Sequence, residues 1–111
     1  MEQLLKKSFK DLADMTLVVA DRFFAAKQTN AMKKNAFLAE FDETDNEQCA
    51  LYINRVYKAF ASLNESERNL INNEFFFQGY LNWWESIYSK ATFYRYKKKA
   101  MRKFLEAFYY D

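Results

Sequence analysis

The stretch YSKATFYRYKKKAMRKF, from Tyr88 to Phe104, contains seven Lys or Arg residues and no acid. Aromatic or small apolar residues recur in it at every third or fourth position, which is the spacing of one face of an α-helix. The pattern predicts a helix from about Lys90 to Tyr109 with Ser89 as its N-cap. Its inward face would consist of Phe93, Tyr96, Ala100, Phe104 and Phe108. The basic residues then form either a nucleic-acid-binding surface or a solvated face of the helix.

The composition of the whole chain favours an all-α fold. At 111 residues, with half of them hydrophobic and a fifth aromatic, the chain is long enough for one domain with a single core. There is no Pro and one Gly, Gly79, which disfavours the tight turns of a sheet protein. We therefore expect a single helical bundle over residues 1–111, with an N-terminal helical part at 1–44 and a second part at 45–111.

Several classes of function are disfavoured by what the chain lacks. With no His and a single Cys, Cys49, it offers neither ordinary zinc ligand sets nor a Ser/His or Cys/His catalytic pair. Glu65 and Glu67 form a carboxylate pair, but they stand at a predicted helix start, where acids are favoured. We expect no enzyme, no catalytic residue, no metal and no cofactor. The N-terminus mixes charges with apolar residues, so we expect a cytoplasmic protein without a membrane partner.

Apolar spacing predicts helices at about residues 2–27, 31–40, 45–62 and 65–76, and a short one at 80–85 that contains Trp83 and Trp84. Thr44 and Asn64 each precede a Glu by three residues, the spacing of a capping box, so we expect them to begin the third and fourth helices. Gly79 is expected to end the fourth helix in the left-handed conformation.

Two apolar stripes complete the predicted core. In the first helix the inward residues would be Leu4, Leu5, Phe9, Leu12, Val19, Phe23 and Ala26. In the third helix they would be Cys49, Tyr52, Ile53, Val56, Tyr57 and Phe60. Because Cys49 lies on this stripe, we interpret it as a small buried hydrophobic residue.

The last three predicted helices have the order of a helix-turn-helix, with the basic helix in the position that enters the major groove. Residues 86–111 contain seven basic residues and two acids, a net charge of +5, which leaves −3 on residues 1–85 of a chain with +2 overall. A basic end on a mildly acidic body favours contact with a polyanion through one surface.

The first turns of the basic helix hold the candidate DNA-binding residues. Arg95 can donate two hydrogen bonds to a guanine edge, Ala91 and Thr92 can contact a thymine methyl group, and Tyr94 can reach a phosphate. The Ser89 cap leaves backbone amides at the helix start available to a phosphate. Lys90 and Lys98 complete this outward face near the start of the helix. Four residues further along better suit phosphates or solubility: Lys97, Lys99, Arg102 and Lys103.

Two segments resemble the C-terminal half of the ArpU/RinA-type phage transcription regulators and, more distantly, region 4 of bacterial sigma factors. They are Leu63-Asn64-Glu65-Ser66-Glu67-Arg68-Asn69-Leu70-Ile71 and YSKATFYRYKKKA at 88–100. The resemblance covers about residues 57–108 and implies promoter or operator binding through Ser89, Lys90, Thr92, Tyr94 and Arg95. The chain departs at Ile87, where the family usually has Gly, and at Lys97, where sigma region 4 prefers an apolar residue. A small helical protein of mycoplasma-like bacteria with this pattern would also fit the composition.

We therefore expect a small, sequence-specific regulator of transcription, bacterial or phage, that binds double-stranded DNA. Its N-terminal half would complete the core or form a homodimer. The alternative is a protein-interaction module, a degenerate helix-turn-helix that docks on RNA polymerase or another factor. Two features favour it: Trp83 and Trp84 cannot both face the core of a helix, and the body of the chain is mildly acidic. A third reading is RNA binding through stacking on Tyr94 and Tyr109.

Overall fold

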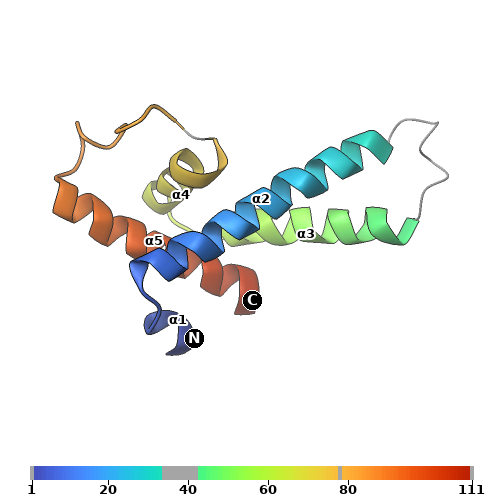
Figure 1. Ribbon diagram of the computed structural model, residues 1–111, viewed down its shortest axis with the longest axis horizontal. Helices are drawn as coiled ribbons and strands as arrows, with labels where there is room; N and C mark the ends of the chain where they lie inside the picture. The colour runs from blue at the N-terminus through green and yellow to red at the C-terminus, as the bar shows by residue number, and fades with distance from the viewer. Residues whose placement is uncertain (1, 34–42, 78, 111) are drawn as a thin grey trace.

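The computed structural model describes residues 2–33, 43–77 and 79–110, and these residues are helical or form turns without any strand. The elements are α1 (Glu2–Leu5), α2 (Phe9–Lys33), α3 (Glu43–Ala61), α4 (Glu65–Ile71), the π-helical turn η2 (Asn72–Phe76) and α5 (Lys90–Tyr110). The prediction of an all-α fold is confirmed. Helices α2 and α3 form a long hairpin that projects from the body of the molecule, and α5 crosses its base (Figure 1).

The core lies where α5 packs against α2, α3 and α4. Its most deeply buried members come from every one of these helices: Leu12, Val19, Val56, Ile71, Phe93, Met101, Phe104 and Leu105. Phe76 of η2 lies among three of the surrounding rings, 4.8 Å from Phe60, 5.4 Å from Phe23 and 5.9 Å from Phe104 between centroids. These are edge-to-face arrangements, which aromatic pairs prefer over face-to-face stacking. One contiguous core therefore fixes the position of α5.

Two predicted helix starts are confirmed, and both use local hydrogen bonds. The Glu67 amide donates to Asn64 Oδ1 at 2.8 Å and the Asn64 amide donates to Glu67 Oε1 at 3.0 Å, which is the reciprocal capping box. The Thr92 amide donates to Ser89 Oγ at 3.3 Å, so Ser89 caps α5. The predicted helix at 65–76 is continuous through α4 and η2, with a π-helical last turn that apolar spacing does not reveal.

Other predicted helix boundaries are wrong. The first helix breaks at residues 6–8, and Ser8 Oγ accepts from the Asp11 amide at 3.1 Å to begin α2. Helix α2 then runs to Lys33 without the break expected near residue 30, and the remainder of the helix predicted at 31–40 lies outside the described residues. Helix α3 begins at Glu43, so Thr44 lies inside the helix and is not its N-cap.

The short helix predicted at 80–85 is also wrong, because residues 81–87 form consecutive turns. The Trp83 amide donates to the Tyr80 carbonyl at 3.0 Å, and Asn82 adopts φ 60°. Asn tolerates this left-handed conformation better than most residues, which interrupts the helix. The positive φ expected at Gly79 is not observed. A Cβ atom at Gly79 would instead lie 2.5 Å from Asn73 Oδ1, so the close approach of this side chain explains the glycine.

Several residues predicted to be buried are exposed or only half-buried. Leu5 and Tyr57 are exposed, and Cys49 is half-buried. Tyr96 is exposed as well, because the buried face of α5 is rotated toward Met101 and Leu105. No described helix is long and apolar enough to cross a membrane.

Tyr52 links α3 to α2 and provides a test of the packing of the hairpin. Its hydroxyl donates to the Val19 carbonyl at 3.1 Å, and burial raises the pKa of the phenol above its ordinary value. We expect Tyr52→Phe to lower the free energy of unfolding by about 0.5–1.5 kcal/mol at pH 7 through the lost hydrogen bond. Urea unfolding of both proteins measures this difference.

The pH dependence of the same pair follows from the direction of the shift. A phenol whose pKa is raised in the folded state contributes stability fully below its unfolded pKa of about 10 and loses it as the pH rises through the folded pKa. The difference in stability between the wild-type protein and Tyr52→Phe should therefore shrink above pH 10, where the unfolded phenol ionises first. A difference that stays constant or grows there would contradict the burial of the phenol.

Candidate nucleic-acid interface

Helix α5 carries a basic stripe on the side opposite its buried residues. At 3.6 residues per turn, side chains three, four and seven positions apart follow one another along one side of a helix. This spacing aligns Arg95, Lys98, Lys99 and Arg102, which together are called the basic stripe. The first three are exposed and Arg102 is half-buried. With a rise of about 1.5 Å per residue, the stripe extends for roughly 10 Å along the helix.

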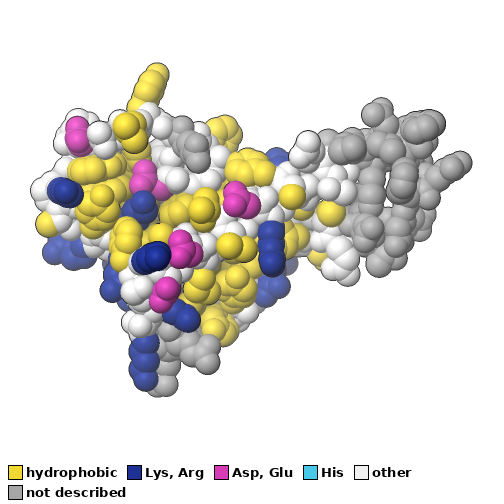
Figure 2. Space-filling model, viewed as in Figure 1, with side chains coloured by type: hydrophobic (Ala, Val, Ile, Leu, Met, Phe, Trp, Pro, Cys, Tyr) yellow, Lys and Arg dark blue, Asp and Glu magenta, His cyan; other side chains and the backbone are white. Residues whose placement is uncertain are grey.

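The charge of the stripe is largely unopposed within the described part of the chain. Arg102 Nε lies 3.9 Å from Glu106 Oε1, one turn further along α5. Among the described residues, no carboxylate oxygen lies within 4 Å of the side-chain nitrogens of Lys90, Arg95, Lys98 or Lys99. Figure 2 shows Lys and Arg side chains at several places on this face of the molecule, some of them at the end where α5 begins. This surface therefore attracts anions.

The first turn of α5 presents the small polar residues predicted to contact DNA. Ser89, Lys90 and Ala91 are exposed, and Thr92 is half-buried. The Ser89 hydroxyl donates to Thr92 Oγ1 at 2.9 Å, in addition to accepting from the Thr92 amide. The two hydroxyls are thus held together at the helix start, beside the basic stripe.

Lys97 does not lie on this surface, although its residue type suggested a phosphate contact. Its ammonium nitrogen lies 2.7 Å from Glu74 Oε1, and the two side chains are only 16% and 19% exposed. The same nitrogen lies 5.3 to 5.9 Å from the ring centroids of Phe9, Phe75 and Phe93. Lys97 therefore covers aromatic residues with its stem and neutralises a half-buried acid. The Lys97 side chain therefore points inward rather than onto the outward basic surface.

Tyr94 and the two tryptophans form one aromatic group at the start of α5. The Trp84 ring stacks on Phe93 with centroids 4.3 Å apart and an angle of 7°, and the Trp83 ring meets Phe93 edge to face with centroids 6.1 Å apart. Trp83 Nε1 also donates to Glu74 Oε2 at 2.9 Å. Both tryptophans are half-buried and contact Phe93, because a turn, unlike a helix, lets adjacent side chains pack on the same ring. Tyr94 is exposed but contacts Phe9 at 5.5 Å.

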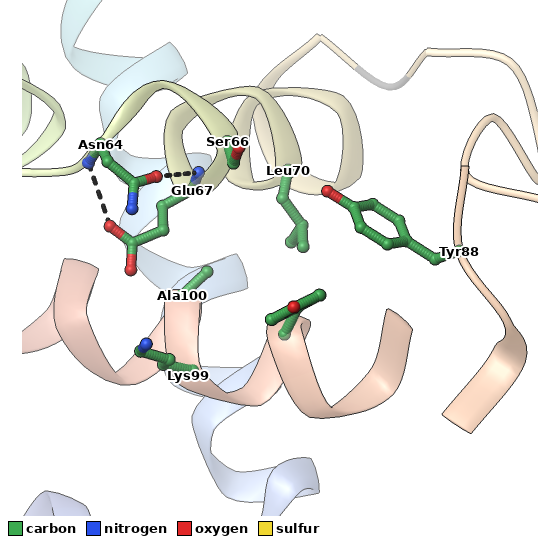
Figure 3. Close-up of a pocket in the computed structure, with 8 residues that line it drawn as sticks. Asn64, Ser66, Glu67, Leu70, Tyr88, Lys99 and Ala100 are labelled. Atoms are coloured by element: carbon green, nitrogen blue, oxygen red, sulfur yellow. Dashed lines mark hydrogen bonds between the residues drawn. The ribbon is translucent and has the colours of Figure 1, made fainter. Parts of the chain in front are cut away.

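A pocket of about 240 Å³ opens between α4 and α5, beside the basic stripe (Figure 3). Its lining comes from both helices and the turn before α5: Asn64, Ser66, Glu67, Leu70, Tyr88, Tyr96, Lys99 and Ala100. The Tyr88 and Tyr96 rings lie 5.4 Å apart, and Arg95 lies 5.7 Å from the Tyr96 ring centroid. Lys103 Nζ lies 3.1 Å from Glu67 Oε2, so the acid in this pocket is already paired. Lys99 belongs to both the pocket and the basic stripe.

The described residues contain no cluster of metal-ligating side chains. Within residues 2–33, 43–77 and 79–110, no group of three or more His, Cys, Asp or Glu side chains gathers closely enough to hold a metal ion. Among the features of the described residues are the basic stripe, the α4–α5 pocket and exposed apolar residues.

The exposed apolar residues that follow η2 were not predicted as a functional feature. Phe77, Tyr80 and Leu81 are 79%, 90% and 91% exposed. The available signal is that Phe77 follows the predicted end of the helix at residue 76, and that Tyr80 and Leu81 follow directly after the polar Gln78-Gly79 break.

The described residues thus form a small all-α protein whose last helix, α5, has one face in the core and a basic exposed face. Comparison of the chain with known protein families, with curated proteins and with solved structures finds no match.

Proposed function

We propose that the protein binds double-stranded DNA through the exposed face of α5 and regulates transcription in this way. The observation that carries the proposal is the basic stripe, four aligned cations on a helix whose opposite face is fixed in the core. An α-helix fits the major groove of B-DNA, and Lys and Arg neutralise the phosphates on its borders. The resemblance of residues 63–71 and 88–100 to ArpU/RinA-type regulators supports the same assignment.

In this proposal the two ends of the exposed face have different roles. Arg95 lies near the start of α5, where it can donate two hydrogen bonds to a guanine edge while Ala91 contacts a thymine methyl group. Lys98, Lys99 and Arg102 follow along the helix and contact phosphates. Lys97 takes no part because it is paired with Glu74.

The proposal includes a helix-turn-helix whose two helices, α4 and α5, are joined by a longer connection than usual. Helices α4 and α5 pack against each other, as the two helices of that motif do. The usual motif joins its helices by a turn of about three or four residues, whereas here α5 begins at Lys90, well beyond the end of η2 at Phe76. The turns at residues 81–87 carry the backbone back to α5, and they do so without a positive φ at Ile87. The Gly usual in the family is thus not needed at this position.

The salt dependence of binding tests the proposal. If the four residues of the basic stripe each neutralise one phosphate, the logarithm of the association constant should fall by about 3.6 per tenfold rise in salt, at about 0.9 per contact. Affinity for a genomic duplex should then drop by about 10²-fold between 50 and 200 mM salt. Fluorescence anisotropy with labelled duplexes measures this slope.

Two results would contradict duplex binding. A slope near zero, or no binding at 50 mM salt, removes the electrostatic basis of the proposal. Tighter binding to single strands than to the matching duplex would instead favour the RNA-binding reading, in which bases stack on exposed tyrosines.

A second candidate function has one observation in its favour. Tyr80 and Leu81 are almost completely exposed, although apolar side chains of this size are usually covered in a protein that works alone. They favour a protein-interaction module that docks on RNA polymerase or another factor. Co-purification with such a partner that survives nuclease and high salt, and that is lost in a Tyr80→Ser, Leu81→Ser variant, would support this function.

A further inference from the structure

An aromatic groove of about 350 Å³ lies where α2, α3 and the α4–η2 segment meet. We use the term aromatic groove for the site whose apolar lining is Phe23, Phe24, Tyr57, Phe60, Phe76 and Phe77. The polar lining residues are Lys27, Arg68, Asn69 and Asn72. None of these ten residues belongs to α5, so the aromatic groove is separate from the basic stripe.

The floor of the groove is buried and its walls are exposed. Phe23 and Phe76 are buried and meet edge to face with centroids 5.4 Å apart. Phe24, Tyr57 and Phe77 stand above this floor and are 46%, 50% and 79% exposed. Covering such aromatic surface is favourable by about 25 cal/mol per Å² removed from water. The groove is therefore shaped to receive an apolar side chain between exposed aromatic walls.

The charges at the groove have one sign. Lys27 and Arg68 lie at its border, and no Asp or Glu is among the described residues that line it. Lys27 Nζ donates to the Tyr57 hydroxyl at 3.0 Å and lies 5.3 Å from the Phe23 ring centroid, so this cation is held directly over the groove. Arg68 is exposed in the last turn of α4. An occupant with carboxylates beside its apolar part would match both cations.

We propose that the aromatic groove binds a short segment of another protein in which a bulky apolar side chain is flanked by Asp or Glu residues. The exposed walls suit a segment that lies along an open surface, and the apolar floor distinguishes this ligand from a nucleic-acid backbone, which offers charge without an apolar side chain. The inference goes beyond DNA binding and does not rest on it, because the two surfaces share no residue.

The test uses three synthetic peptides with blocked ends and the full-length, isotope-labelled protein. The first has two phenylalanines flanked on each side by two aspartates. The second replaces the aspartates with lysines, and the third replaces the phenylalanines with alanines. In a titration followed by the amide signals of the protein, the first peptide should shift the signals of the groove residues. It should bind about tenfold more tightly than the second peptide, since each of two exposed ion pairs contributes modestly. The third should shift none of these signals.

Matched variants separate the apolar and charged contributions. Phe77→Ala, at an exposed wall position, should weaken the acidic peptide several-fold, whereas Tyr80→Ala, equally exposed but outside the groove, should leave its affinity unchanged. In the variant Lys27→Gln, Arg68→Gln the preference for the acidic over the basic peptide should disappear. Circular dichroism checks that each variant is folded.

Three outcomes would overturn the inference. They are equal binding of the acidic and basic peptides to the wild-type protein, shifts that lie outside the groove, and a concentration-dependent dimer in sedimentation that Phe77→Ala dissolves. The last result would show that a second copy of this chain fills the groove.

Discussion

Replacing the four residues of the basic stripe with glutamine should abolish measurable duplex binding. The variant changes Arg95, Lys98, Lys99 and Arg102, whose side chains project away from the core. If each of these residues contacts a phosphate, the release of counterions at the four sites raises the affinity at 50 mM salt by more than about 10³-fold. Any residual binding of the variant should show a salt slope close to zero. Anisotropy titrations of the wild-type and variant proteins at 50 mM salt measure the loss, and the stability should stay within about 1 kcal/mol, because surface ion pairs contribute little.

A matched control keeps the change in net charge but places it on other segments of the chain. It replaces four exposed cations of the α1–α3 region with glutamine: Lys7, Lys10, Arg22 and Lys58. If binding depends only on the overall charge of the protein, both variants lose the same affinity and the proposed interface is wrong. If α5 is the interface, the control should retain most of its affinity and the same salt slope.

The same pair of variants distinguishes the two candidate functions. The apolar residues Tyr80 and Leu81 precede α5 and carry no charge, so a partner that docks on them should still co-purify with the basic-stripe variant. Loss of DNA binding together with retention of a protein partner would assign both functions to separate surfaces. Retention of DNA binding in the basic-stripe variant would show that another surface binds DNA and would contradict the proposed interface.

The parts of this fold that could be predicted from the sequence depend on interactions between residues three or four positions apart. The capping box at Asn64 and Glu67 and the Ser89 cap need only a side chain and an amide three residues away, and both form as the sequence indicates. Helix α5 begins at Lys90, directly after this cap, as predicted. Thr44 shows the limit of such signals, because its spacing is right while the helix begins before it at Glu43.

The direction in which each side chain of α5 points depends on distant segments and could not be predicted from spacing. Tyr96 and Lys97 are neighbours, and residue type alone places the aromatic side chain inside and the cation outside. The structure reverses them, because Glu74 and the rings of Phe9 and Phe75 surround Lys97 from other elements. The candidate site therefore kept most of its predicted exposed residues and lost Lys97, whose partner lies far away in the sequence.

Truncating Phe93 should cost more stability than any other single change at the start of α5. Phe93 is 1% exposed and supports Trp84, which stacks on it at 4.3 Å, and Lys97, whose ammonium group lies 5.9 Å from its ring. Phe93→Ala removes a large buried ring and leaves a cavity, so the free energy of unfolding should fall by about 3–5 kcal/mol. Since small domains have about 5–15 kcal/mol in total, this is a large fraction. Urea unfolding followed by tryptophan fluorescence measures it.

Tyr96→Ala is the matched control, an aromatic truncation three residues further along the same helix. Spacing places Phe93 and Tyr96 on one inward face, whereas in the structure Tyr96 is 43% exposed and contacts mainly Tyr88 and Arg95. Its loss should therefore cost no more than about 1 kcal/mol, as is usual for aromatic pairs near the surface. Equal losses for the two variants would mean that α5 is rotated to the orientation that spacing predicts. Arg95 and Lys98 would then turn toward its flank, and the basic stripe would no longer face outward as one surface.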